Sequence, residues 1–175
     1  MYERIMIVVD EGAIARAALD EGLALAQVHA AEVVFFHVLP NFVLPLPDMP
    51  AVASLGPESH RKAVQRVARR VLAAAQQRAG VLGVAATSQI GADVDAAECI
   101  ARAAAEHRCQ LIVIGSHGRS AIQRLVFGSV VSGLIARAPV PVLVCKKADK
   151  RPVTKGARAL APAKRRRVTS STRAA

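Results

Sequence analysis

Residues 111–129 read LIVIGSHGRSAIQRLVFGS, an apolar run followed by a segment that begins and ends on glycine. The run Leu111–Ile114 is short, continuous and rich in isoleucine and valine, which is typical of a strand buried on both faces of a parallel sheet. The segment opens at Gly115 and reaches Gly128 just before a predicted helix, Ser129 to about Arg137. This stretch therefore predicts a strand, a glycine-punctuated loop and a helix start in direct succession.

Runs of strand character also occur on both sides of this stretch. They cover residues 5–9, 33–38, 83–90 and 140–144, and segments with helical spacing lie between them at 12–30, 58–78 and 92–107. Residues 40–57 contain five of the nine prolines and are predicted to form a long surface loop. The alternation predicts an α/β fold, a Rossmann-like open sheet of five parallel strands with helices on both faces.

The positive charge is concentrated at one end of the chain. The net charge is +11, yet residues 1–145 carry 13 Lys/Arg against 12 Asp/Glu, whereas residues 146–175 carry 11 against Asp149 alone. We therefore expect a nearly neutral domain over 1–146 and a basic, disordered tail over 147–175. The tail is interpreted as a solubilising extension or as a weak contact for nucleic acid or an anionic surface.

Composition argues against several classes of protein. The uncharged run Leu125–Ala136 spans twelve residues, too few for a transmembrane helix. The amino terminus leads directly into a strand without the features of a secretory signal. The three cysteines are widely spaced and form no CxxC pair, so they are interpreted as small buried apolar residues. A cytoplasmic protein without a metal site of its own is expected.

Candidate site residues lie where predicted strands end. Ligands of open α/β sheets bind beyond the carboxyl ends of the strands, and Asp10, Val38 and Gly115 occupy such ends. The helix beginning at Gly128-Ser129-Val130 presents amide groups and a positive helix end suited to phosphate. Asp10 is suited to ribose hydroxyls, and Val8 and Val38 to the faces of adenine. The alternative is that the glycines make tight turns and Asp10 caps a loop.

The segment Gly115 to Ser129 resembles the universal stress protein signature G-x2-G-x9-G-[ST], whose defined positions are matched by Gly115, Gly118, Gly128 and Ser129. The likeness runs from about Tyr2 to Lys146. It implies the Rossmann-like, adenine nucleotide alpha hydrolase-like fold, with ATP, ADP or AMP as ligand and possible Mg²⁺. The implied contacts are Asp10 to ribose, Val8, Val38 and Gly115 to adenosine, Gly118, Gly128, Ser129 and Val130 to phosphates, and His117 lining the loop.

The resemblance also implies a regulatory or stress-response role and a homodimer joined through the strand Val142–Val144. One departure from the family pattern is notable, because Asp10 is followed here by Glu11-Gly12 instead of Gly-Ser. Glu11 adds negative charge near the expected phosphate site. The sequence offers no catalytic set, and the alternatives to a regulatory binding protein are slow ATP hydrolysis and a binding module that acts through the basic tail.

Overall fold

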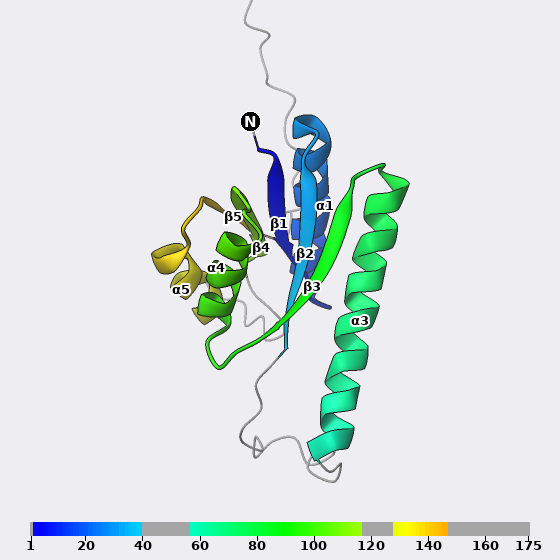
Figure 1. Cartoon of the computed structure of the whole chain (residues 1–175), viewed down its shortest axis with the longest axis vertical. Coiled ribbons are helices and arrows are strands. Elements are labelled where there is room, and N and C mark those ends of the chain that lie inside the picture. Colours follow the sequence, from blue (N-terminus) through cyan, green and yellow to red (C-terminus); the bar gives the residue numbers. More distant parts are fainter. Residues whose placement is uncertain (1, 40–56, 117–127, 147–175) are drawn as a thin grey trace, which may run out of the picture.

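The computed structural model describes residues 2–39, 57–116 and 128–146 (Figure 1). Its sheet has five parallel strands in the order β3-β2-β1-β4-β5. The strands are β1 (Arg4–Val8), β2 (Glu32–Leu39), β3 (Ala86–Ala92), β4 (Leu111–Gly115) and β5 (Val142–Cys145). The predicted Rossmann-like α/β sheet is therefore confirmed, with β1 at its centre and β5 at one edge.

Helices cover both faces of this sheet. They are α1 (Ala13–His29), α3 (Pro57–Val81), α4 (Ala96–Glu106) and α5 (Ser129–Arg137). In Figure 1, α1 and α3 lie on one face and α4 and α5 on the other. The beginning of α3 extends past the carboxyl ends of β1 and β2 in the same view. The two sides of the sheet thus form two separate apolar layers.

Side-chain alternation along the strands divides the core between these layers. Ile7 and Phe35 pack in the layer under α1 and α3, whereas Met6 and Phe36 pack in the layer under α4 and α5. All four side chains are buried. Because both faces of β1 and β2 are covered, the strands read as continuous apolar runs instead of alternating ones.

The starts of β3 and α4 differ from those predicted. Gly83 adopts a left-handed conformation with φ of 68°, and the amide of Val84 donates to the carbonyl of Ala79 at 3.0 Å. The chain therefore turns before β3, which begins at Ala86 instead of residue 83. The next helix begins at Ala96 instead of about residue 92, because the Asp95 carboxylate caps it by accepting hydrogen bonds from the first-turn amides.

The cysteines of the described chain are free thiols. Cys99 and Cys109 are buried, as predicted, whereas Cys145 is only half-buried. Burial raises the pKa of the Cys109 thiol to about 11, so this side chain stays protonated at neutral pH. The burial of both side chains matches a packing role for Cys99 and Cys109.

Several predictions concern residues outside the described ranges. These are the surface loop 40–56, the site residues His117 and Gly118, and the basic tail 147–175. None of the helices in the described chain combines the length and apolar character needed to cross a membrane.

Candidate functional site

The two stretches expected to form a site meet at the carboxyl edge of the sheet. β1 and β4 are hydrogen-bonded neighbours, with Ile7 opposite Val113, so Asp10 and Gly115 leave the sheet from adjacent strands. A Cβ placed on Gly115 would lie 3.1 Å from Ile14 Cγ2 and 3.2 Å from the Ala15 amide nitrogen. Glycine at position 115 therefore lets the end of β4 approach the first turn of α1.

The beginning of α5 is attached to the end of β4. The amide of Gly128 donates to the carbonyl of Ser116 at 3.2 Å. The Gly128 amide is therefore already engaged, contrary to the expectation that it is offered to a phosphate. The first helical bond of α5 runs from the Ser132 amide to the Gly128 carbonyl at 3.0 Å. The amides of Ser129, Val130 and Val131 precede this bond, and such first-turn amides have no acceptor within their own helix.

Two helix starts lie at this edge, and glycine stands at the cap position of each. Gly12 precedes α1 and Gly128 precedes α5. Among the described residues no side chain caps either helix, and neither helix has an acidic residue in its first turn. By contrast, α4 is capped by the Asp95 carboxylate. Because the amide end of a helix carries partial positive charge, α1 and α5 bring two positive helix ends to the region of Gly115.

An apolar wall accompanies these helix ends. Val8, Val38 and Val130 are half-buried, and all three pack against the core layer under α4 and α5. The ends of β1 and β2 are tied together, because the Val9 amide donates to the Phe36 carbonyl at 2.9 Å. The buried His37 ring adds a hydrogen bond between its Nδ1 and the Val9 carbonyl at 2.8 Å. Val8 and Val38 therefore have fixed positions on one side of the sheet.

The segment after β1 places two carboxylates in succession. Asp10 is half-buried, and its Oδ1 accepts a hydrogen bond from the Glu11 amide at 2.6 Å. The Glu11 carboxylate forms an ion pair with the guanidinium of Arg70 in α3. Helical spacing in the sequence alone favours a solvated face for the arginines of α3. The pair joins residues 59 positions apart, and no local spacing indicates it.

The predicted site residues are therefore distributed as follows. The structure brings together the ends of the central strands and the start of α5, which carry Val8, Asp10, Val38, Gly115, Gly128, Ser129 and Val130. His117 and Gly118 lie outside the described residues. Within the described part of the chain, no group of three or more His, Cys, Asp or Glu side chains is arranged to hold a metal ion.

The fold and this edge define a class of protein, the Rossmann-like α/β proteins with open helix starts beyond the central strands. The model of the universal stress protein family matches residues 1–146. The chain therefore belongs to the universal stress protein family. A curated relative, the universal stress protein in the QAH/OAS sulfhydrylase 3′ region of Thermus aquaticus, is 28% identical over 146 residues, covering 83% of this chain and all of the relative.

Solved structures agree with this family. A universal stress protein family member from Burkholderia pseudomallei is 31% identical, with a TM-score of 0.66 over 82% of this chain and 95% of the other. The Archaeoglobus fulgidus protein in complex with dAMP has a TM-score of 0.62 at 21% identity, covering 83% and 98% of the two chains. A family protein from Arabidopsis thaliana with AMP bound gives 0.60 at 17%, covering 87% and 97%. At these lower identities the likeness concerns the fold.

Proposed function

We propose that this chain binds an adenine nucleotide at the carboxyl edge of its sheet and acts as a regulatory protein whose conformation or partner binding depends on the ligand. One observation carries the proposal, namely the meeting of Asp10, the end of β4 at Gly115 and the uncapped start of α5. This arrangement offers a hydrogen-bond acceptor, close backbone approach and a positive helix end at one place. The family members described with dAMP and with AMP support an adenine nucleotide as the ligand.

Each described residue has a role that its position favours. In the proposal, the Asp10 carboxylate accepts hydrogen bonds from the ribose hydroxyls. Val8 and Val38 pack against adenine from the side of the core layer that they share. The phosphates bind the amides of Ser129 and Val130 together with the exposed Ser129 hydroxyl. The roles of His117 and Gly118 remain predictions from the family resemblance.

The proposal has three more specific parts, namely that the ligand is ATP, that Mg²⁺ accompanies it and that the protein is cytoplasmic. Mg²⁺ would be held chiefly by ligand phosphates, since this ion retains several waters and uses few protein ligands. We propose binding without rapid turnover, in which the ligand state is read by a partner.

The test of the proposal is direct ligand binding by Asp10→Ala and by a matched Asp20→Ala variant. Asp20 lies on the exposed side of α1, where it pairs with Arg78 at 2.9 Å. We expect Asp10→Ala to weaken AMP binding by about 10- to 100-fold, because the loss of a hydrogen bond to a charged acceptor costs about 1.5–3 kcal/mol. Asp20→Ala should bind as the wild type does. Isothermal titration calorimetry measures both, and equal affinity of all three proteins would contradict the assignment of Asp10.

The edge strand β5 supports a second part of the proposal, a homodimer. β5 pairs with β4 on one side, and all four of its residues are half-buried. An apolar edge of this kind is suited to pairing with a second copy. Sedimentation equilibrium at micromolar concentration should therefore give twice the chain mass of 18.4 kDa. A mass of one chain under these conditions would contradict the dimer.

A further inference from the structure

The ion pair between Glu11 and Arg70 joins α3 to the segment that follows β1. Arg70 Nη2 contacts Glu11 Oε1, and the two side chains are 72% and 32% exposed. Arg70 is the fourteenth of the 25 residues of α3, near the middle of this helix. The contact therefore brings a cation of α3 to the edge of the sheet that carries the candidate site.

Among the described residues, charges of both signs meet at this edge. The uncapped starts of α1 and α5 contribute partial positive charge. Asp10 and Glu11 contribute two carboxylates in succession, and Glu11 immediately precedes the Gly12 cap of α1. An anionic ligand at this edge is attracted by the helix ends and repelled by these carboxylates. Arg70 offsets the charge of Glu11 within their ion pair.

We propose that Glu11 and Arg70 together set the preference of this site for the number of phosphates on its ligand. The inference rests on the proposed nucleotide function. The pair is neutral as a whole, so the site accepts ligands of several negative charges. Removal of Arg70 leaves the Glu11 carboxylate to repel polyphosphates, and removal of Glu11 leaves a cation that attracts them. Both effects grow with ligand charge and vanish for uncharged adenosine.

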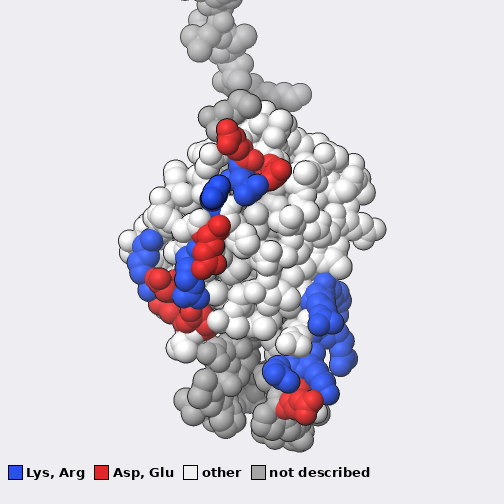
Figure 2. Space-filling view, viewed as in Figure 1, with Lys and Arg blue, Asp and Glu red and all other residues white. Residues whose placement is uncertain are grey.

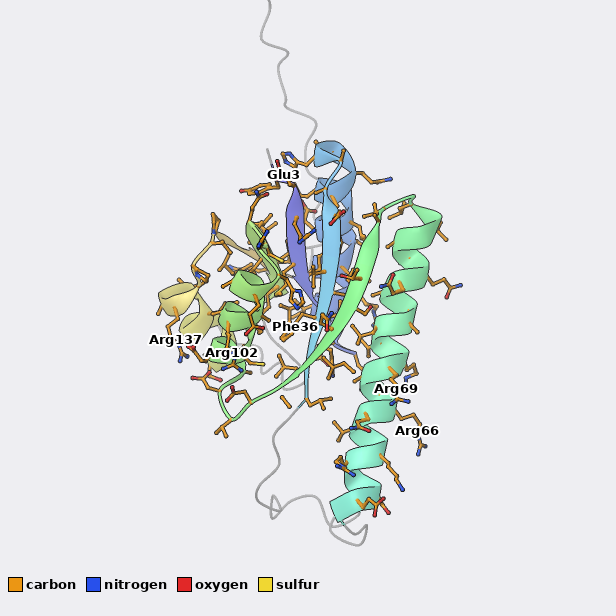
Figure 3. All side chains as sticks on the ribbon, in the orientation of Figure 1. Glu3, Phe36, Arg66, Arg69, Arg102 and Arg137 are labelled. Atoms are coloured by element: carbon orange, nitrogen blue, oxygen red, sulfur yellow. The ribbon has the colours of Figure 1, made fainter. Side chains whose placement is uncertain are left out.

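Neighbouring arginines provide matched controls. Figure 2 shows basic side chains gathered over the first part of α3, and Figure 3 shows that Arg66 and Arg69 belong to the same helix. Both are exposed, and within the described chain neither forms an ion pair. Arg66 lies one helical turn from Arg70, so Arg66→Gln removes the same charge from the same surface without touching Glu11.

The experiment compares the full-length wild type with Arg70→Gln, Glu11→Gln, the double variant and Arg66→Gln. Calorimetry without divalent cations measures the Kd of adenosine, AMP and ATP at about 0.03 M and at about 0.5 M salt. The electrostatic screening length is about fourfold shorter at the higher salt concentration. Circular dichroism and thermal unfolding establish that each variant is folded.

For Arg70→Gln we expect ATP to bind about tenfold more weakly, AMP about threefold more weakly and adenosine unchanged at low salt. Glu11→Gln should shift the same affinities in the opposite direction, and the double variant should return close to the wild type. All shifts should shrink at high salt, and Arg66→Gln should show a much smaller effect.

Two results would overturn the inference in ways that differ from failure of the proposed function. Equal weakening of adenosine and ATP in Arg70→Gln would show that the pair shapes the site instead of tuning its charge. Equal effects of Arg66→Gln and Arg70→Gln would show a general surface field without a role for Glu11. By contrast, a wild-type protein that binds none of the three ligands would reject nucleotide binding itself, and the inference with it.

Discussion

Replacement of Ser129 by aspartate is expected to weaken AMP and ATP binding by about a hundredfold while leaving the protein folded. A carboxylate at the start of α5 would meet the ligand phosphates, and two unit charges about 5 Å apart at an effective dielectric constant of about 20 repel by about 3 kcal/mol. The same substitution places a negative charge at a positive helix end, which stabilises α5. Calorimetry should therefore show weaker nucleotide binding, whereas thermal unfolding should show a more stable protein.

The control for this prediction is Ser132→Asp in the same helix. Ser132 is also exposed, and its amide already donates to the Gly128 carbonyl. Its side chain lies about one turn further from the helix start, so its effect on phosphate binding should be much smaller. Undiminished nucleotide affinity in Ser129→Asp would remove the start of α5 from the proposed site.

Replacement of Phe35 by alanine is expected to lower the free energy of unfolding by about 3–5 kcal/mol. Phe35 is 0% exposed and packs in the core layer under α1 and α3. Loss of its ring leaves a cavity that neighbouring aliphatic side chains fill only in part. Thermal unfolding should show a midpoint lowered by about 10 °C.

Val28→Ala provides the comparison for Phe35→Ala. Val28 lies in α1 and is 81% exposed, so its truncation should change stability by less than about 0.5 kcal/mol. A small effect at Phe35 would show that the layer collapses readily around the missing ring. It would also weaken the view that a few large side chains hold the two faces of the sheet in place.

Most of the fold follows from local sequence. Strands buried on both faces produce continuous apolar runs, and this explains why the runs around Ile7, Phe35 and Val113 predict β1, β2 and β4. The boundary errors arose where a single residue governs the chain direction. Gly83 makes a left-handed turn before β3, and the Asp95 cap delays α4. The Asp95-x-x-Glu98 spacing is a capping signal that would have located the second boundary.

The site was less predictable than the fold. Strand ends and glycines point to the carboxyl edge of the sheet, because parallel strands all finish on the same side. The engaged amide of Gly128 and the Glu11–Arg70 pair depend on which residues meet in three dimensions. Helical spacing in a sequence does not distinguish an arginine that faces solvent from one that forms an ion pair. The partner of Arg70 is therefore evident only from the position of α3 beside the sheet.

The hydrogen bond between Gly128 and Ser116 fixes the two ends of residues 117–127 beside each other. The free energy of closing a chain segment rises only slowly with its length, by about 0.6 kcal/mol for each doubling. Insertions or deletions between these anchors are therefore inexpensive for the sheet and leave β4 and α5 in register.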